Sequence, residues 1–307
     1  MAAVNKNSVI DLAAVRQIGN IELLARQMVE GFITGLHKSP YHGFSVEFAE
    51  HKIWNTGEGT RHIDWKVFAK TDRIFTKRYE EETNLRCRIL IDTSSSMYYP
   101  RPDNGKITFS IFAAACLTYL LQRQRDAVGI STFSEGIDLV TQVKSTPSHV
   151  HKIFLQLQGL LGEPPVEKKT SAASVIHEIA ESMNKRSLII IFSDMFGVEN
   201  EAELYNALQH LRHNRHEVLI FHVADNATEI DFDFEDRPYE FIDLESGERL
   251  KLNPSQVKEY YRASQNRFSE ELKMRCGQYK IDFIEADIRK PMDQILLPYL
   301  VKRGKMR

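Results

Sequence analysis

A short apolar run that leads directly into a polar turn constrains this chain more than any other feature. Residues 88–91 read Arg-Ile-Leu-Ile and are followed by Asp92-Thr-Ser94-Ser-Ser96. A continuous apolar run of this length predicts a buried strand of a parallel sheet. The turn places one carboxylate and two hydroxyl groups at the carboxyl end of that strand, where ligands bind in open α/β sheets.

Strand-like and helix-like segments alternate from residue 86 to residue 307, which is the pattern of a parallel sheet. The predicted strands are residues 87–91, 127–133, 137–143, 187–192, 217–223 and 281–284. The predicted helices are residues 106–124, 148–160, 171–184, 199–213, 255–275 and 291–302. The short turn Ser134-Glu-Gly136 makes the second and third strands antiparallel. We therefore predict a doubly wound α/β domain with a mainly parallel six-stranded sheet, in the common strand order 3-2-1-4-5-6.

Two smaller segments are predicted before this domain. Residues 1–38 form an N-terminal helical segment, with a break at Gly19. Residues 39–85 form a small β unit, in which residues 44–48, 63–68 and 73–79 are strand-like.

An insertion is predicted inside the α/β domain, at residues 226–254. It contains a hairpin with strands 239–245 and 248–252 and a two-residue turn at Ser246-Gly247. The acidic and aromatic run 229–243 is interpreted as a solvated loop, with docking of a Lys/Arg-rich partner as the alternative.

Composition excludes several classes of protein. The formal net charge of -2 gives no global field that favours nucleic acid. The N-terminus has no apolar core of signal-peptide length, and no apolar run approaches the roughly 18 residues of a membrane span. The cysteines are three scattered residues, Cys87, Cys116 and Cys276, which indicates free thiols in a reducing compartment. We expect a cytoplasmic protein that binds no nucleic acid and does not span a membrane.

Three predicted loops bring oxygen ligands to one edge of the sheet. The first carries Asp92, Ser94 and Ser96, a second carries Thr170, and the loop after the fourth strand carries Asp194. The first and fourth strands flank the switch point of the predicted order. Oxygen ligands suit a hard cation such as Mg²⁺ or Mn²⁺.

Each candidate ligand also has a structural interpretation that the residues leave open. The serines are a possible cap of helix 106–124, although Pro100, Pro102 and Gly105 separate them from it. Thr170 is a possible N-cap of helix 171–184, and Asp194 is a possible turn acid. His210, His213 and His216 are interpreted as a solvated helix end, because no acidic partner of known ligand spacing accompanies them.

The same residues resemble the von Willebrand factor A domain and its metal-ion-dependent adhesion site. There, an Asp-x-Ser-x-Ser turn, a threonine and a further aspartate hold one divalent cation. The resemblance carries over to Asp92, Ser94, Ser96, Thr170 and Asp194 of this sequence. It implies the same doubly wound fold and a role for Mg²⁺ (or Mn²⁺) in binding a protein partner.

A second resemblance covers most of residues 40–225. The order glycine–acidic–x–x–arginine–x–isoleucine–aspartate–tryptophan before an Asp-x-Ser-x-Ser strand is similar to the family called domain of unknown function 58. Those positions are filled here by Gly57, Glu58, Arg61, Ile63, Asp64 and Trp65. The resemblance implies a partner, a MoxR-type AAA+ ATPase or other von Willebrand A-type proteins, and a role in protein assembly or maturation.

These observations favour a binding module over an enzyme. The sequence has no recognisable nucleophile–base pair and no HExxH or P-loop motif. The preferred hypothesis is a non-catalytic, divalent-metal-dependent protein-interaction module. The alternatives are an Mg²⁺-dependent hydrolase of phosphate esters and a scaffold with a vestigial metal site.

Overall fold

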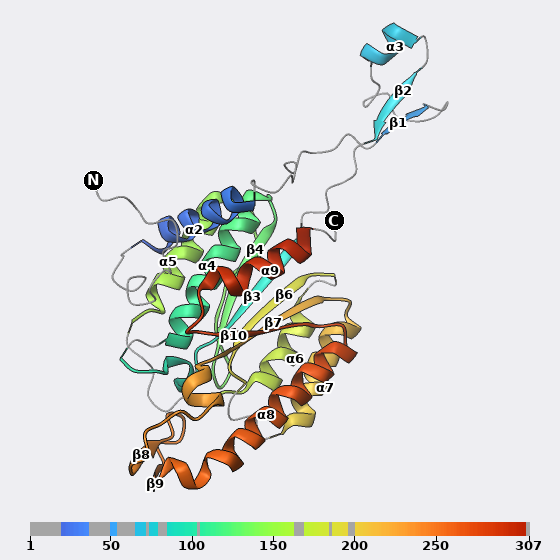
Figure 1. Ribbon diagram of the computed structural model, residues 1–307. Coiled ribbons are helices and arrows are strands. Elements are labelled where there is room, and N and C mark those ends of the chain that lie inside the picture. The colour runs from blue at the N-terminus through green and yellow to red at the C-terminus, as the bar shows by residue number, and fades with distance from the viewer. Residues whose placement is uncertain are drawn as a thin grey trace, which may run out of the picture. The chain divides into compact units, whose positions relative to one another are not determined.

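The computed structural model describes residues 20–36, 50–53, 65–71, 74–78, 85–102, 105–162, 169–183, 186–195 and 200–304 (Figure 1). The chain divides into two compact units. The larger comprises Met1–Thr34 and Leu85–Arg307, and the smaller comprises Gly35–Asn84.

The larger unit is built on one six-stranded sheet in the order β10-β7-β6-β3-β4-β5. Its strands are β3 (Arg86–Asp92), β4 (Ala127–Phe133), β5 (Ile137–Val140), β6 (Leu188–Ser193), β7 (Glu217–Ala224) and β10 (Asp282–Asp287). All neighbours are parallel except β4 and β5. This is the predicted order, so the predicted doubly wound, mainly parallel fold is confirmed.

Helices cover both faces of this sheet (Figure 1). One face packs against α2 (Ile21–Leu36), α4 (Gly105–Arg123), α5 (Pro147–Gly159) and α9 (Met292–Gly304). The other packs against α6 (Ala172–Ser182), α7 (Glu201–His213) and α8 (Pro254–Gln278). Side chains alternate between the faces, so Ile89 and Ile91 lie in the first core and Leu90 in the second.

Strand β5 ends at Val140, earlier than the predicted residue 143, and its pairing with β4 is irregular at its start. The register shifts between Thr132 and Phe133. Beyond Val140 the chain stays close to β4, and a Cβ on Gly129 would lie 2.8 Å from the backbone oxygen of Gln142. Gly129 therefore permits this close approach.

Helix α4 is the buried centre of the first core. By length and composition it is the one helix among the described residues that could cross a membrane, but 83% of its apolar window is buried inside the protein. The sheet and its neighbouring helices explain that burial, as in the core helix of an α/β fold. The three cysteines, Cys87, Cys116 and Cys276, are free, as predicted, and all three are buried.

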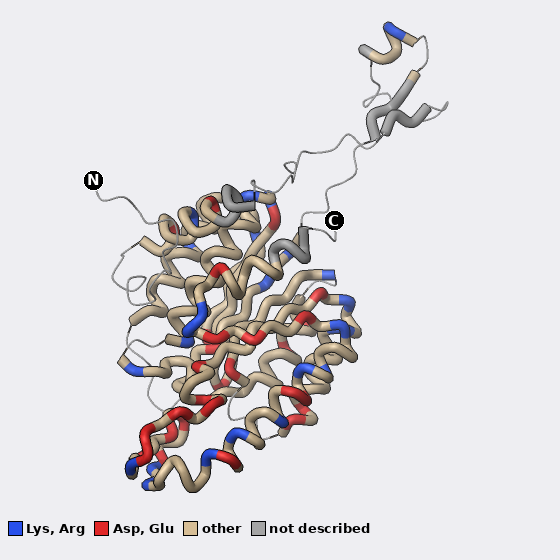
Figure 2. The backbone as a smooth tube through the Cα atoms, in the orientation of Figure 1, with Lys and Arg blue, Asp and Glu red and all other residues tan. Residues whose placement is uncertain are grey.

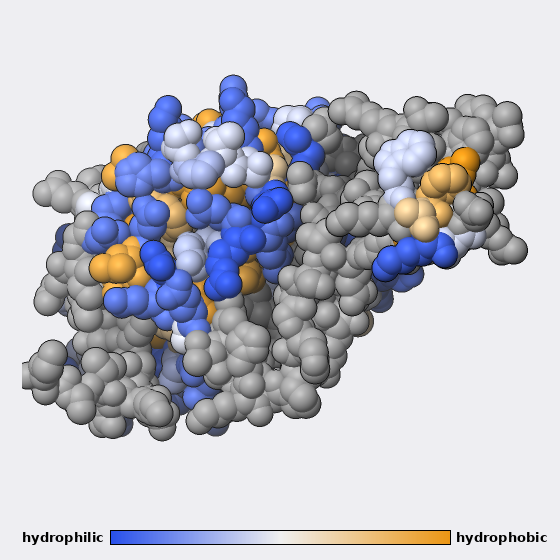
Figure 3. Space-filling model, turned by 90° about the horizontal axis from the view of Figure 1, so that it is seen from above, coloured by the Kyte–Doolittle hydropathy of each residue, from blue (hydrophilic) through white to orange (hydrophobic). Residues whose placement is uncertain are grey.

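The described surface seen from above is mostly hydrophilic, with small separate hydrophobic patches (Figure 3). Isolated exposed leucines occur on the helices, such as Leu23 on α2 and Leu155 on α5. Scattered single apolar side chains of this kind are ordinary for a globular surface.

The smaller unit contains an antiparallel pair, β1 (Glu50–Ile53) with β2 (Phe75–Arg78), and the helix α3 (Trp65–Thr71). The prediction of a strand at residues 63–68 is therefore wrong for its described part. Trp65 and Phe68 are three residues apart, and their rings meet edge to face at 6.2 Å, which helical spacing allows. The predicted strand 44–48 lies outside the described residues.

The insertion contains a short π-helical turn, η3 (Asn226–Ile230), and the hairpin β8 (Tyr239–Ile242) with β9 (Arg249–Leu252). The predicted two-residue turn is wrong, because the connection spans residues 243–248. Asp243 holds it: its side chain accepts from the backbone N–H of Glu245 at 2.8 Å and from the Ser246 hydroxyl at 2.6 Å. Gly247 has a φ of 74°, which suits glycine.

Candidate metal centre

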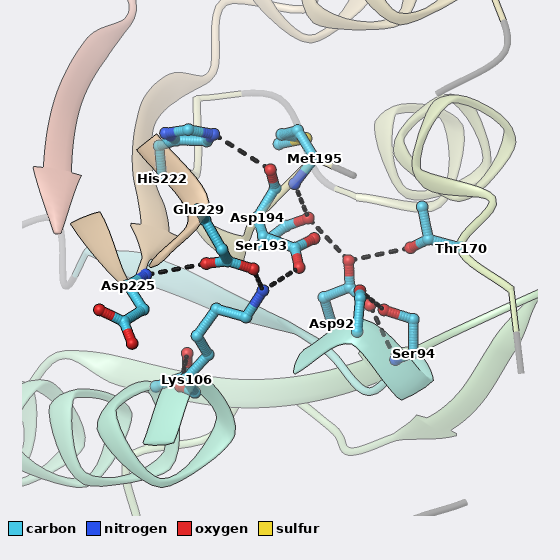
Figure 4. A network of polar contacts seen from close by, with 12 residues as sticks. Asp92, Ser94, Lys106, Thr170, Ser193, Asp194, Met195, His222, Asp225 and Glu229 are labelled. Carbon is cyan, nitrogen blue, oxygen red and sulfur yellow. Dashed lines mark hydrogen bonds and ion pairs between the residues drawn. The ribbon is translucent and has the colours of Figure 1, made fainter. Parts of the chain in front are cut away.

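The site lies at the carboxyl ends of β3 and β6, which are neighbours in the sheet (Figure 4). Ile91 pairs with Phe192, so the next residues along the two strands, Asp92 and Ser193, come side by side. Asp194 follows at once, and Thr170 approaches from the segment before α6. The three loops that carry Asp92, Thr170 and Asp194 therefore come together in the structure, as predicted.

Asp92 is fully buried and is the centre of the polar network. Its Oδ2 atom accepts hydrogen bonds from the hydroxyls of Ser193 at 2.7 Å and Thr170 at 2.9 Å. Its Oδ1 atom accepts from the backbone N–H of Ser94 at 2.9 Å. Burial, followed by the charge of Asp194, raises the pKa of Asp92 to about 6, against the opposing effect of the Ser193 and Ser94 hydrogen bonds.

The serines of the turn face each other and do not cap α4. Ser95–Tyr98 form a buried 3-10 turn, η2, between β3 and α4. The Oγ atoms of Ser94 and Ser96 are 3.1 Å apart, and both residues are buried. The helix-cap interpretation of the serines is therefore wrong.

Thr170 also does not cap its helix. The N-cap position of α6 is Ser171, and its side chain makes no capping hydrogen bond. The Thr170 hydroxyl donates to Asp92 instead. The turn, the threonine and Asp92 thus form one connected group of oxygen atoms.

Lys106, in the first turn of α4, is one residue of the site that sequence reasoning missed. It is fully buried, and its Nζ atom lies 2.7 Å from Asp194 Oδ2 and 2.5 Å from Glu229 Oε1 (Figure 4). Burial alone would lower the pKa of Lys106, but the charges of Asp194 and Glu229 outweigh burial and raise it. The signal was available, because Lys106 is the lone charged residue between positions 106 and 122, a segment that is mostly apolar.

Glu229 reaches this group from η3 in the insertion. Its second oxygen, Oε2, accepts from the backbone N–H of Asp225 at 2.8 Å. Burial raises the pKa of Glu229, while Lys106 opposes the shift. The interpretation of run 229–243 as a solvated loop is therefore wrong at Glu229, and also at Phe232, which is buried.

His222 fixes the backbone next to Asp194. The His222 Nε2 atom lies 3.0 Å from the carbonyl oxygen of Asp194; a carbonyl only accepts, so Nε2 donates. Burial lowers the pKa of His222, so the ring is neutral near pH 7. The His222 ring thus holds the loop after β6, and its Nε2 atom is occupied by the hydrogen bond to the Asp194 backbone oxygen.

Glu245, from the β8–β9 connection, is the second residue that sequence reasoning missed. Its Oε1 atom is buried and has no hydrogen-bond partner in the described part of the chain. Burial, opposed by hydrogen bonding from Ser96 and from the Thr170 backbone, raises the pKa of Glu245 to about 7, and the charges of Asp194 and Asp92 add to the shift. Glu245 therefore lies against the turn and Thr170.

The charges around the site are unbalanced. The site holds four acidic side chains, Asp92, Asp194, Glu229 and Glu245, and the ammonium of Lys106, which pairs with Asp194 and Glu229. Figure 2 shows acidic residues gathered at the hairpin and the strand ends beside it. Hydroxyl and carboxylate oxygens with excess negative charge fit a hard divalent cation. Within the described ranges, no group of three or more His, Cys, Asp or Glu side chains could hold a metal ion, so a cation here would use hydroxyl ligands as well.

The three histidines of the α7 end do not share one environment. His213 is exposed, as predicted for a solvated helix end. His216 is fully buried, and its Nδ1 atom accepts from the backbone N–H of Ser187 at 3.3 Å. His210 lies 3.1 Å, Nδ1 to Nδ1, from His177 of α6. The prediction is wrong for His216, because the chain turns there into the buried strand β7.

Solved structures with a similar fold include a conserved hypothetical protein, BatB, from Bacteroides thetaiotaomicron. It is 12% identical with a TM-score of 0.38, over 66% of this chain and 90% of that chain. An aerotolerance-related membrane protein from Bacteroides fragilis is 14% identical with a TM-score of 0.41, over 69% and 100%. A von Willebrand factor type A structure from Catenulispora acidiphila is 16% identical with a TM-score of 0.35, over 46% and 34%.

Uncharacterized proteins of Mycobacterium tuberculosis and Mycobacterium bovis are 23% identical to this chain over 205 residues. The match covers 67% of this chain and 63% of the relatives' length. The model of the family described as protein of unknown function DUF58 matches residues 50–271. That span is most of the chain and includes every candidate ligand, so the chain belongs to the DUF58 family.

Proposed function

We propose that this chain is a non-catalytic protein-interaction module whose binding depends on a divalent cation, Mg²⁺ or Mn²⁺. The observation that supports the proposal is the convergence of Asp92, Ser94, Ser96, Thr170 and Asp194 at the ends of β3 and β6. The excess of carboxylates over ammonium groups around them adds to it.

The five candidate residues would have two different roles toward the cation. The hydroxyls of Ser94, Ser96 and Thr170 would ligate the cation, while Asp92 and Asp194 would supply negative charge. Mg²⁺ takes a near-octahedral set of ligands and keeps several waters. A carboxylate of a protein partner could replace one of those waters, and the cation would then bridge the two proteins.

The partner class rests on the family resemblance. It points to a MoxR-type AAA+ ATPase or another von Willebrand A-type protein, and to assembly or maturation of a client. In such a pair the ATPase would supply the energy and this chain would supply recognition.

Calorimetry with Mn²⁺ and Mg²⁺ tests the proposal. We expect wild-type protein to bind one cation and Asp92→Asn to lose binding, because the substitution removes a charge and keeps the shape. Asp236→Asn is the matched control, since Asp236 is an exposed acid of the 226–254 insertion and is none of the candidate ligands. Equal binding by wild type and Asp92→Asn would show that the cation does not use this site.

Lys106 favours one alternative, a scaffold that needs no metal. Its ammonium already lies 2.7 Å from Asp194, where it acts as a fixed cation. Such a scaffold would capture the same native partners with Mg²⁺ and with EDTA, whereas the proposed module would lose them in EDTA. Mg²⁺-dependent phosphate-ester hydrolysis that disappears in Asp194→Ala would support a hydrolase instead.

A further inference from the structure

The β8–β9 connection presents a buried acid from an otherwise exposed loop. Glu245 is 7% exposed, while its neighbour Ser246 and the later Glu248 are exposed. The loop is held in shape by Asp243, whose backbone N–H donates to the Glu248 carbonyl at 2.8 Å and whose carbonyl accepts from Gly247. The inward position of Glu245 is therefore a feature of a defined turn.

Among the described residues, the largest electrostatic influences on Glu245 include no positive charge. It lies against Ser96 and Thr170, and the nearby charges of Asp92 and Asp194 are of the same sign. The described cation of the site, Lys106, is engaged by Asp194 and Glu229. The buried Oε1 atom of Glu245 has no hydrogen-bond partner in the part of the chain that is described. A buried carboxylate is stable only when paired or bound to a metal.

We propose that Glu245 is an internal ligand of the cation, in the position that a carboxylate of a protein partner would take. This inference rests on the proposed function, because it requires a cation at the Asp92 turn. It adds a regulatory role for the insertion: the β8–β9 hairpin closes the site, and a partner's acid must displace Glu245 to bind.

The base of the hairpin is suited to hold this closed position. Phe232 is buried, and its ring lies 5.6 Å from Phe241 of β8 and 4.6 Å from Tyr261 of α8. Aromatic packing thus anchors the hairpin to α8, and the Asp243 turn directs its tip at the site. Displacement of the tip would leave this anchor in place.

Mn²⁺ bound to the full chain provides the test, read by water proton relaxation, which rises with the number of water molecules on the ion. In Glu245→Gln we expect more exchangeable water on bound Mn²⁺ and an affinity lower by about tenfold or more, since a charged ligand is lost. Glu248→Gln, an exposed acid of the same loop, is the matched control and should match wild type.

Thermal stability separates ligation from a purely structural role. Without metal, Glu245→Gln should be at least as stable as wild type, because the substitution removes a buried acid that lies beside the like charges of Asp92 and Asp194 and whose Oε1 atom has no hydrogen-bond partner among the described residues. With saturating Mn²⁺, wild type should gain more stability than the variant. A structural role predicts that the variant is less stable in both conditions, and that result would overturn the inference.

The possible failures are distinguishable. If wild type binds Mn²⁺ and Glu245→Gln shows the same affinity and water relaxation, only the internal-ligand inference is wrong. If wild type binds no Mn²⁺, the proposed function and the inference both fail.

Discussion

A single buried lysine dominates the electrostatics of the site. Lys106 is among the largest fully buried side chains, and it is paired with two acids from different elements. The protein tolerates a buried ammonium because both partners lie within hydrogen-bond distance. Removing it would leave the acids Asp194 and Glu229 without the ammonium that both of them contact.

We expect Lys106→Met to lower the free energy of unfolding by about 3–5 kcal/mol, because it leaves uncompensated buried charges. Lys273→Met is the matched control. Its ion pair with Glu285 has a similar length, 2.9 Å, but both side chains are more than half exposed, so a loss below about 1 kcal/mol is expected. Urea denaturation followed by circular dichroism measures both. Equal losses would mean that the Lys106 pair is as weak as a surface pair.

At the scale of elements, the chain passes within a few residues from the polar end of α7 to the buried strand β7. His216 sits at this junction and is fully buried, and the guanidinium of Arg212 donates to its backbone oxygen. Burial lowers the pKa of His216 below its ordinary value. The unfolded chain therefore takes up a proton at a higher pH than the folded protein.

This difference makes His216 a source of acid sensitivity. Stability from a neutral buried histidine is present above about pH 6.5 and is lost as the pH falls below it, by at most about 1.4 kcal/mol per pH unit. We expect His216→Gln to lose less stability than wild type between about pH 7.5 and about pH 5.5. His213→Gln, at an exposed histidine three residues away, should behave as wild type. Urea denaturation at the two pH values decides, and identical acid losses in wild type and His216→Gln would contradict the prediction.

At the scale of the molecule, the candidate ligands belong to the larger unit alone. Asp92, Thr170 and Asp194 lie on β3, before α6 and after β6, all within Leu85–Arg307. The smaller unit, Gly35–Asn84, contributes none of them. A ligand that binds only the folded state stabilises the unit that holds it.

We therefore expect Mg²⁺ to stabilise the larger unit selectively. At about 100 times its Kd, the cation should add about 2.7 kcal/mol to the free energy of unfolding. Amide hydrogen exchange should slow in β3, β6 and α6 and remain unchanged in β1, β2 and α3. Asp92→Asn should lose the effect, and slower exchange in that variant would place the cation elsewhere.

Much of the fold was predictable because its signals are local. Apolar runs such as 188–192 and the all-apolar face of α4 fix the strands and the core helix by their own composition. The segment 63–68 misled because it is short: Ile-Asp-Trp-Lys-Val-Phe alternates apolar and polar residues over too few positions to separate a strand from a helix. Trp65 and Phe68 meet only once the helix has formed.

The sequence alone determined the strand order and therefore the meeting of Asp92 with Asp194, because parallel strands with right-handed connections leave few arrangements. Only the tertiary structure decided which charges join them. Lys106 enters from the first turn of α4, and Glu229 and Glu245 return from an insertion more than a hundred residues along the chain. No periodic pattern encodes such contacts, because they depend on how the hairpin folds back onto the sheet and on the balance of buried charge there.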